Sequence, residues 1–182
     1  MKKALSALFI FISIISFAQE TKSDLQKIIR ANFLSPGVEI EFPISAKSTI
    51  SANAGIGISG SYKNLSHAHG FNYFISPFLD LSYKKIYNRN SRANKGKSLL
   101  YNSGNYWGIR LLTNFNEIES HNIIRKDNVD FAFGPTWGLQ RAYGRFHFLF
   151  DLGPVYYFDT KGNSGFFPIM MQLNLGYNLL AK

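Results

Sequence analysis

Alternation of hydrophobic and polar residues dominates the chain beyond its N-terminal segment. In seven runs apolar side chains occupy most of the alternate positions, the pattern of a β-strand with two different faces. These runs cover residues 38–44, 50–59, 71–83, 107–115, 129–140, 146–156 and 167–179. No later stretch holds about 18 consecutive apolar residues, so the sequence predicts strands rather than a transmembrane helix.

The length of the runs and the residues on their polar side favour one kind of β-protein. Most runs exceed the roughly 5–6 residues of soluble strands and match the roughly 9–11 that a tilted membrane strand needs. The polar positions are mostly Gly, Ser, Asn and Thr, which suits a narrow, packed lumen. We therefore predict an antiparallel, up-and-down transmembrane β-barrel, with a soluble β-sandwich as the alternative.

The strand count follows from parity. Bacterial single-chain barrels have an even number of strands, with both termini on the periplasmic side. Residues 28–34 can supply an eighth strand, and Ser35-Pro36-Gly37 then forms a tight turn. The alternative is one long strand over residues 28–44. Eight strands place turns 35–37, 63–70, 117–127 and 159–165 outside, and connections 45–48, 84–104 and 141–144 in the periplasm.

The N-terminal segment has the features of a secretory signal peptide. Lys2 and Lys3 precede an apolar run, and Ser16-Phe17-Ala18 places small residues at the positions that a signal peptidase requires. We expect cleavage after Ala18, which leaves residues 19–182 as a single barrel domain. An uncleaved N-terminal anchor is the alternative.

Composition agrees with an envelope location. Aromatic residues make up 16% of the chain, and such residues anchor proteins at membrane interfaces. The formal net charge is +9, which anionic lipid head groups can balance without any nucleic acid. The chain has no cysteine, which excludes disulfides and cysteine-based metal sites.

The connection 84–104 is long and basic, unlike the usual short periplasmic turn. It is expected to contain a short helix that ends at a glycine. It is either a polybasic patch held at an anionic membrane surface or a solvated connector. Its basic residues are Lys84, Lys85, Arg89, Arg92, Lys95 and Lys97.

Aromatic residues fall near both ends of the expected strands, as the two girdles of a membrane barrel would require. In a soluble protein they would be ordinary core residues. The group expected at the periplasmic interface is Tyr83, Trp107, Trp137, Phe146 and Tyr177. The outer group is Phe71, Tyr73, Phe158 and Phe166.

Three segments carry a resemblance to a known class: residues 134–144, with the sequence Gly-Pro-Thr-Trp-Gly-Leu-Gln-Arg-Ala-Tyr-Gly, residues 102–106, and residues 173–177. The chain resembles small outer-membrane β-barrel proteins of the OmpA-like and porin-like kind from Gram-negative bacteria. The resemblance implies an eight-stranded barrel in the outer membrane, and such families mostly lack an assigned activity. It also implies outer-membrane lipids and, during biogenesis, the barrel-assembly machinery as partners.

Several charged positions fall on the polar face of the strands and should point into the lumen. Opposite charges in a narrow barrel should pair, because an unpaired buried charge is costly. They form either a salt-bridged plug or a polar path for ions or a small solute. The predicted lumen network is Arg30, Glu39, Glu41, Asp80, Arg110, Asp130, His147 and Asp151.

The sequence contains no clear catalytic motif. None of His67, His69, His121 and His147 has the serine and acid spacing of a lipid deacylase. His67 and His69 lack a third metal ligand, and no Gly-rich loop links a strand to a helix. We expect a monomeric, non-enzymatic protein without metal or cofactor, in a structural or surface-interaction role. The alternatives are a narrow channel or a barrel that binds a small ligand or lipid, and then a lipid-modifying enzyme.

Overall fold

The computed structural model describes residues 24–62, 71–121 and 128–182, so the predicted signal peptide 1–18 lies outside the described residues. The described residues form nine antiparallel strands and two short helical segments. The strands are β1 Ile28–Asn32, β2 Gly37–Pro43, β3 Ser48–Tyr62, β4 Phe71–Ile86, β5 Gly104–Asn114, β6 Glu119–His121, β7 Asp130–Tyr143, β8 Phe146–Asp159 and β9 Ser164–Ala181. The helical segments are α2 Arg89–Asn94 and a 3₁₀ turn at Leu100–Asn102.

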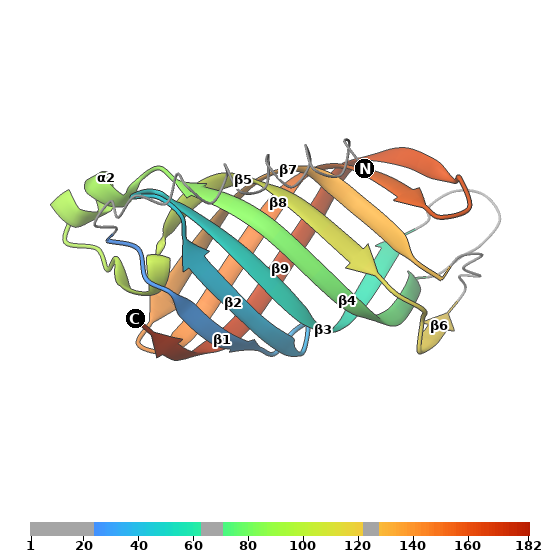
Figure 1. Ribbon diagram of the computed structural model, residues 1–182, viewed down its shortest axis with the longest axis horizontal. Helices are drawn as coiled ribbons and strands as arrows, with labels where there is room; N and C mark the ends of the chain where they lie inside the picture. The colour runs from blue at the N-terminus through green and yellow to red at the C-terminus, as the bar shows by residue number, and fades with distance from the viewer. Residues whose placement is uncertain (1–23, 63–70, 122–127) are drawn as a thin grey trace, which may run out of the picture.

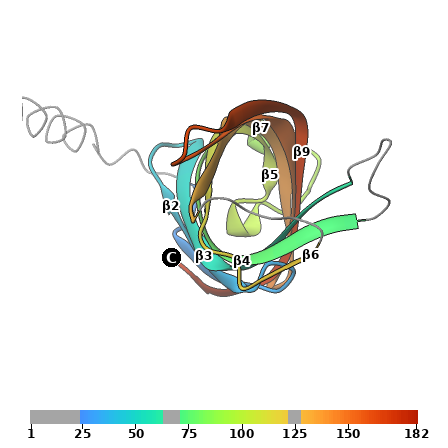
Figure 2. The same cartoon turned by 90° about the vertical axis from the view of Figure 1, so that its right-hand side faces the viewer.

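The sheet closes on itself. Its strand order is β3-β2-β1-β9-β8-β7-β5-β4-β6, and β3 also pairs with β4 (Figures 1 and 2). Eight strands therefore make a closed, barrel-like ring, each paired antiparallel with its neighbours. The all-β fold is as predicted, but the strand count is nine rather than eight. The additional strand is β6, which pairs with β4 alone and lies in the predicted loop 117–127.

The first strand is separate from the second. Arg30 pairs with Glu39 across the β1–β2 hairpin, and residues 33–36 form the turn between them. On its other side β1 pairs with the end of β9, which closes the ring. The prediction of a separate first strand is therefore correct, although the strand ends at Asn32 and the turn covers residues 33–36 rather than 35–37. The alternative of one long strand is wrong.

The two ends of the ring differ. Backbone hydrogen bonds join Lys27 to Lys182 at one end. The segment between β4 and β5 lies at that same end, which we call the connector end. Figure 2 looks along the ring from the opposite end, and part of the segment between β4 and β5 is visible through the opening. The connector comprises residues 87–103. It is shorter than the predicted 84–104 because β4 continues to Ile86 and β5 begins at Gly104. Its short helix is as expected.

Side chains alternate between the two faces of every long strand. The outward face is apolar along its length, with side chains such as Val38, Phe133 and Leu173 about half exposed. The inward face is polar, and buried polar residues outnumber buried hydrophobic ones in the described chain. The hydrophobic cluster of Leu25, Ile86 and Tyr106 is confined to the connector end. This distribution is the reverse of that in a soluble domain, in which apolar residues fill the interior.

Candidate functional site: the charged interior

A buried cluster of opposite charges occupies the connector half of the ring. The guanidinium of Arg30 donates to Glu39 at 3.3 Å and to Glu41 at 2.6 Å, and its Nη1 lies 3.0 Å from Nε2 of His147. All four side chains are buried. Strand alternation explains the grouping, because inward positions on β1 and β2 face each other in register.

Lys84 belongs to this cluster and not to the connector, which corrects the sequence prediction. It lies on β4, and its Nζ is 3.3 Å from a carboxylate oxygen of Glu39 and 3.3 Å from Oε1 of Gln140. The ammonium also lies 5.5 Å from the ring centre of Tyr106. Lys85, the next residue, points outward onto the ring of Trp107 at 5.4 Å.

The connector inserts one side chain into the charged interior. Asn102 is fully buried, and its Nδ2 donates to Glu41 at 3.0 Å and to the carbonyl of Gln26 at 2.9 Å. Its own carbonyl accepts from Gln140 at 2.8 Å. Asn102 has φ 58°, a left-handed backbone that asparagine tolerates better than most residues. The connector thereby closes this end of the ring.

Removing the Asn102 side chain should release the connector. We expect Asn102→Ala to lower the free energy of local opening by about 2–3 kcal/mol, because it leaves buried groups of Glu41 and Gln26 without their partner. Hydrogen exchange of the backbone amides in residues 99–104 measures this opening. The control is Asn94→Ala, an exposed asparagine of the same connector, which should shift protection by less than about 0.5 kcal/mol. Equal effects of the two variants would contradict the closing role.

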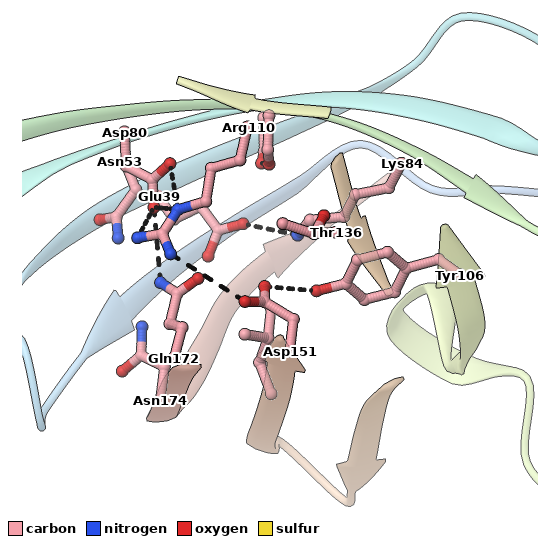
Figure 3. A pocket seen from close by; sticks show the side chains of 13 residues that line it. Glu39, Asn53, Asp80, Lys84, Tyr106, Arg110, Thr136, Asp151, Gln172 and Asn174 are labelled. Carbon is pink, nitrogen blue, oxygen red and sulfur yellow. Dashed lines mark hydrogen bonds and ion pairs between the residues drawn. The ribbon is translucent and has the colours of Figure 1, made fainter. Parts of the chain in front are cut away.

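A second charged layer lies farther along the ring (Figure 3). Arg110 on β5 donates from Nε to both oxygens of Asp80 at 3.0 Å, and its Nη2 lies 2.9 Å from the same carboxylate. Asp151 lies 4.0 Å from Arg110 and accepts from the hydroxyl of Tyr106 at 2.8 Å. Gln172 on β9 donates to Asp80 at 3.4 Å.

Tyr106 crosses the interior between the two layers, and a glycine makes room for it. Gly138 is its direct partner on β7, and a Cβ at Gly138 would lie 2.7 Å from the ring of Tyr106. The alternation-based prediction of the network lacks Tyr106, Gln140 and Asn102. Tyr106 lies an even number of residues from Arg110 on the same strand, and Gln140 lies an even number from Thr136. The period-2 pattern therefore does predict that both side chains point inward.

The interior between the layers is almost filled. The cavity there has a volume of about 10 Å³ and is bounded by residues of both layers, including Lys84, Tyr106 and Asp151. Such a space holds one water molecule at most. Side chains thus close the ring over this stretch, which agrees with the small interior of a barrel with eight strands.

Asp130 does not join the network. It lies at the start of β7, at the end of the ring away from the connector, where its Oδ1 accepts from Asn114 at 2.9 Å. The residue is only half-buried. Alternation predicted its inward direction but not its depth, since a period of two says nothing about position along the strand.

The aromatic residues selected from the sequence lie on the outer face toward the connector end. Tyr83 contacts Trp107 with ring centres 6.2 Å apart, and Phe146 contacts Tyr177 at 5.6 Å. The indole of Trp137 donates to the hydroxyl of the connector's Tyr87 at 3.0 Å. These five selected aromatics lie on four neighbouring strands and on β9.

The basic residues of the connector divide into two groups. Arg89 donates to the carbonyls of Leu99 and Asp24, and Arg92 donates to the carbonyl of Ser98, so both hold the connector's backbone in place. Lys95 and Lys97 are exposed. Of the four basic residues in the connector, only Lys95 and Lys97 are therefore exposed and free of hydrogen bonds to the connector's own carbonyl groups.

The histidines of the described residues do not belong to a metal-binding group. His121 stacks on Tyr73 with ring centres 5.5 Å apart, while His67 and His69 lie outside the described residues. Across residues 24–62, 71–121 and 128–182, no three His, Asp or Glu side chains are placed to hold a metal ion. In the same residues no helix is long and apolar enough to cross a membrane. No family model, curated protein or solved structure matches the chain.

Proposed function

We propose that the chain is an integral outer-membrane β-barrel with a non-catalytic, structural or surface-interaction role and a closed interior. One observation carries the proposal, namely the apolar outer face of a closed sheet whose interior is polar. A soluble monomer rarely exposes an apolar patch of more than a few hundred Å². A lipid bilayer is the solvent in which this distribution is favourable, and strand pairing around the closed part of the sheet satisfies the backbone there.

The outer belt covers most of the ring. On the long strands it includes exposed side chains from β2, β3, β5, β7, β8 and β9, and these are Val38, Phe42, Ile50, Ile56, Ile58, Trp107, Ile109, Phe133, Trp137, Phe146, Phe167, Ile169, Met171, Leu173, Leu175 and Leu179. They are spread over six strands, so a single protein partner would have to encircle the ring to cover the belt. This continuity favours lipid over a protein interface.

The connector end supports an orientation as well. The aromatic residues there suit the boundary between hydrocarbon and head groups. Lys85 lies over Trp107 beside them, and Lys95 and Lys97 lie on the exposed connector. Lysines at this level favour anionic lipid head groups by about 1 kcal/mol each. We therefore place the connector end at the periplasmic surface.

Gel mobility and fractionation test the proposal together. We expect the unheated protein to migrate faster than the boiled protein in detergent gels, because a closed sheet resists unfolding, and to be recovered in outer-membrane fractions. A soluble, folded protein in the periplasm would contradict the membrane location. Insertion without any effect of heating would contradict a closed barrel. The same two measurements serve as the folding check for each variant below.

A further inference from the structure

The wall of the ring has a side opening in the half that lies away from the connector end. The β1–β2 hairpin is short beside β3 and β9 (Figure 1). Pairing between β2 and β3 ends at Gly55, and pairing between β1 and β9 ends at Gly176. Single backbone bonds follow, from Ile56 to Pro36 and from Phe33 to Leu175. Beyond them, no strand of the described chain pairs with the edges of β3 and β9 that flank the hairpin.

A cavity of about 140 Å³ lies in this opening. Its sides are residues 57–59 of β3 and 170–173 of β9, and Ser35 of the turn between β1 and β2 also lines it. Ile58 and Met171 at the rim are among the most exposed apolar side chains, at 62% and 68%. Phe78 and Leu112 continue the apolar lining inward. The opening therefore connects the outer apolar belt with the interior.

The inner end of the cavity is polar. Arg110, Asn114 and Gln172 line it. The amide nitrogens of Gln172 and Asn114 donate to Asp80 and Asp130. The side-chain oxygens of the same two amides are hydrogen-bond acceptors. Arg110 contributes N–H groups, so this end offers both donors and acceptors to a ligand.

The charges at the inner end decide which head group fits. Among the described residues Arg110 is the one charged residue that lines the cavity, and it is paired with Asp80 and faces Asp151. An anion placed against Arg110 would therefore meet two carboxylates that already share its charge. Displacing them would leave buried negative charge without a partner, which is costly. An uncharged head group with hydroxyl and ester oxygens avoids this cost.

The level of the opening agrees with such a ligand. Met171 lies six residues along β9 from Tyr177, at the aromatic boundary of the connector end. Six residues at about 3.3 Å each, tilted by about 40°, rise about 15 Å across an apolar band of about 25 Å. The opening thus begins in the distal half of the band and extends toward the opposite head groups, where lipid esters and hydroxyls lie.

We infer that the opening between β3 and β9 is a binding site for an uncharged, single-chain glyceride, which enters sideways from the membrane. The acyl chain lies against Ile58 and Met171, and the glycerol ester reaches Arg110, Gln172 and Asn114. This site goes beyond the structural role proposed above, and the inference rests on that membrane location.

Binding of three probes with one chain length tests the head-group preference. Monooleoylglycerol, oleate and oleylamine would be titrated into the folded protein in detergent micelles and detected by native mass spectrometry. We expect saturable binding of one monooleoylglycerol, with oleate at least about tenfold weaker because of Asp80 and Asp151. Oleate or oleylamine binding as tightly as the glyceride would overturn the inference, as would adducts that never saturate.

A pair of variants tests the location. Ser59→Phe places an aromatic ring on the wall of the cavity and should weaken monooleoylglycerol binding at least about tenfold by filling its space. Ile50→Phe, on the outward face of the same strand near the connector end, should change binding less than about twofold. Equal binding by both variants would overturn the site. Heat-modifiable mobility of each variant shows whether the barrel is folded, so loss of binding in a folded barrel separates failure of this site from failure of the proposed function.

Discussion

Replacing Arg30 by methionine is expected to lower the free energy of unfolding by about 3–5 kcal/mol, the usual cost of breaking a buried ion pair on one side. Arg30 is fully buried and is the direct partner of both Glu39 and Glu41. Methionine has a similar length but cannot donate. Glu39 would then keep its ion pair with Lys84, but Glu41 would lose its ion pair with Arg30. Urea titration in detergent micelles, followed by the loss of heat-modifiable mobility, measures the change.

Two further variants separate the charge pair from a general effect of the substitution. Arg145→Met removes an exposed arginine from the β7–β8 turn at the same end of the ring, and it should cost less than about 0.5 kcal/mol. Adding Glu41→Gln to Arg30→Met removes one of the two carboxylates and should restore part of the lost stability. If Arg30→Met were as mild as Arg145→Met, the charged cluster would not hold the strands together.

The sequence predicts the faces of the sheet well because the period of a strand is a local property. Each inward charge from Arg30 to Asp151 follows the same alternation, and the register of the ring brings them together. The first strand, β1, was predicted because barrels have an even number of strands. Its own pattern is too short to be distinctive. The ninth strand, β6, was missed because three residues carry no usable pattern.

Lys84 and Asn102 show where local reasoning fails. Lys84 begins a run rich in lysine and arginine, and that composition concealed the continuing alternation of Asp80, Ser82 and Lys84. Its burial depends on Glu39, which lies two strands away in the sheet order. Asn102 lies in a connector without any period, so its insertion beside Glu41 follows only from the closure of the ring.

The outer belt allows a direct test of the solvent that surrounds the ring. Leu173 on β9 and Leu100 in the connector are exposed to a similar degree, at 51% and 57%. In water, arginine at either position would be tolerated equally well, since exposed substitutions usually change stability by less than about 0.5 kcal/mol. In a membrane only Leu173 lies within the apolar band.

We therefore expect Leu173→Arg to lower the stability of the inserted protein by about 2–4 kcal/mol, the cost of arginine near the middle of a bilayer on a barrel's lipid face. Leu100→Arg should change it by less than about 0.5 kcal/mol, because the connector lies among head groups and water. Urea titrations of both variants, folded into phospholipid vesicles, measure the difference. Equal stability of the two variants would mean that Leu173 faces water, and the apolar outer face would then require a protein partner instead of lipid.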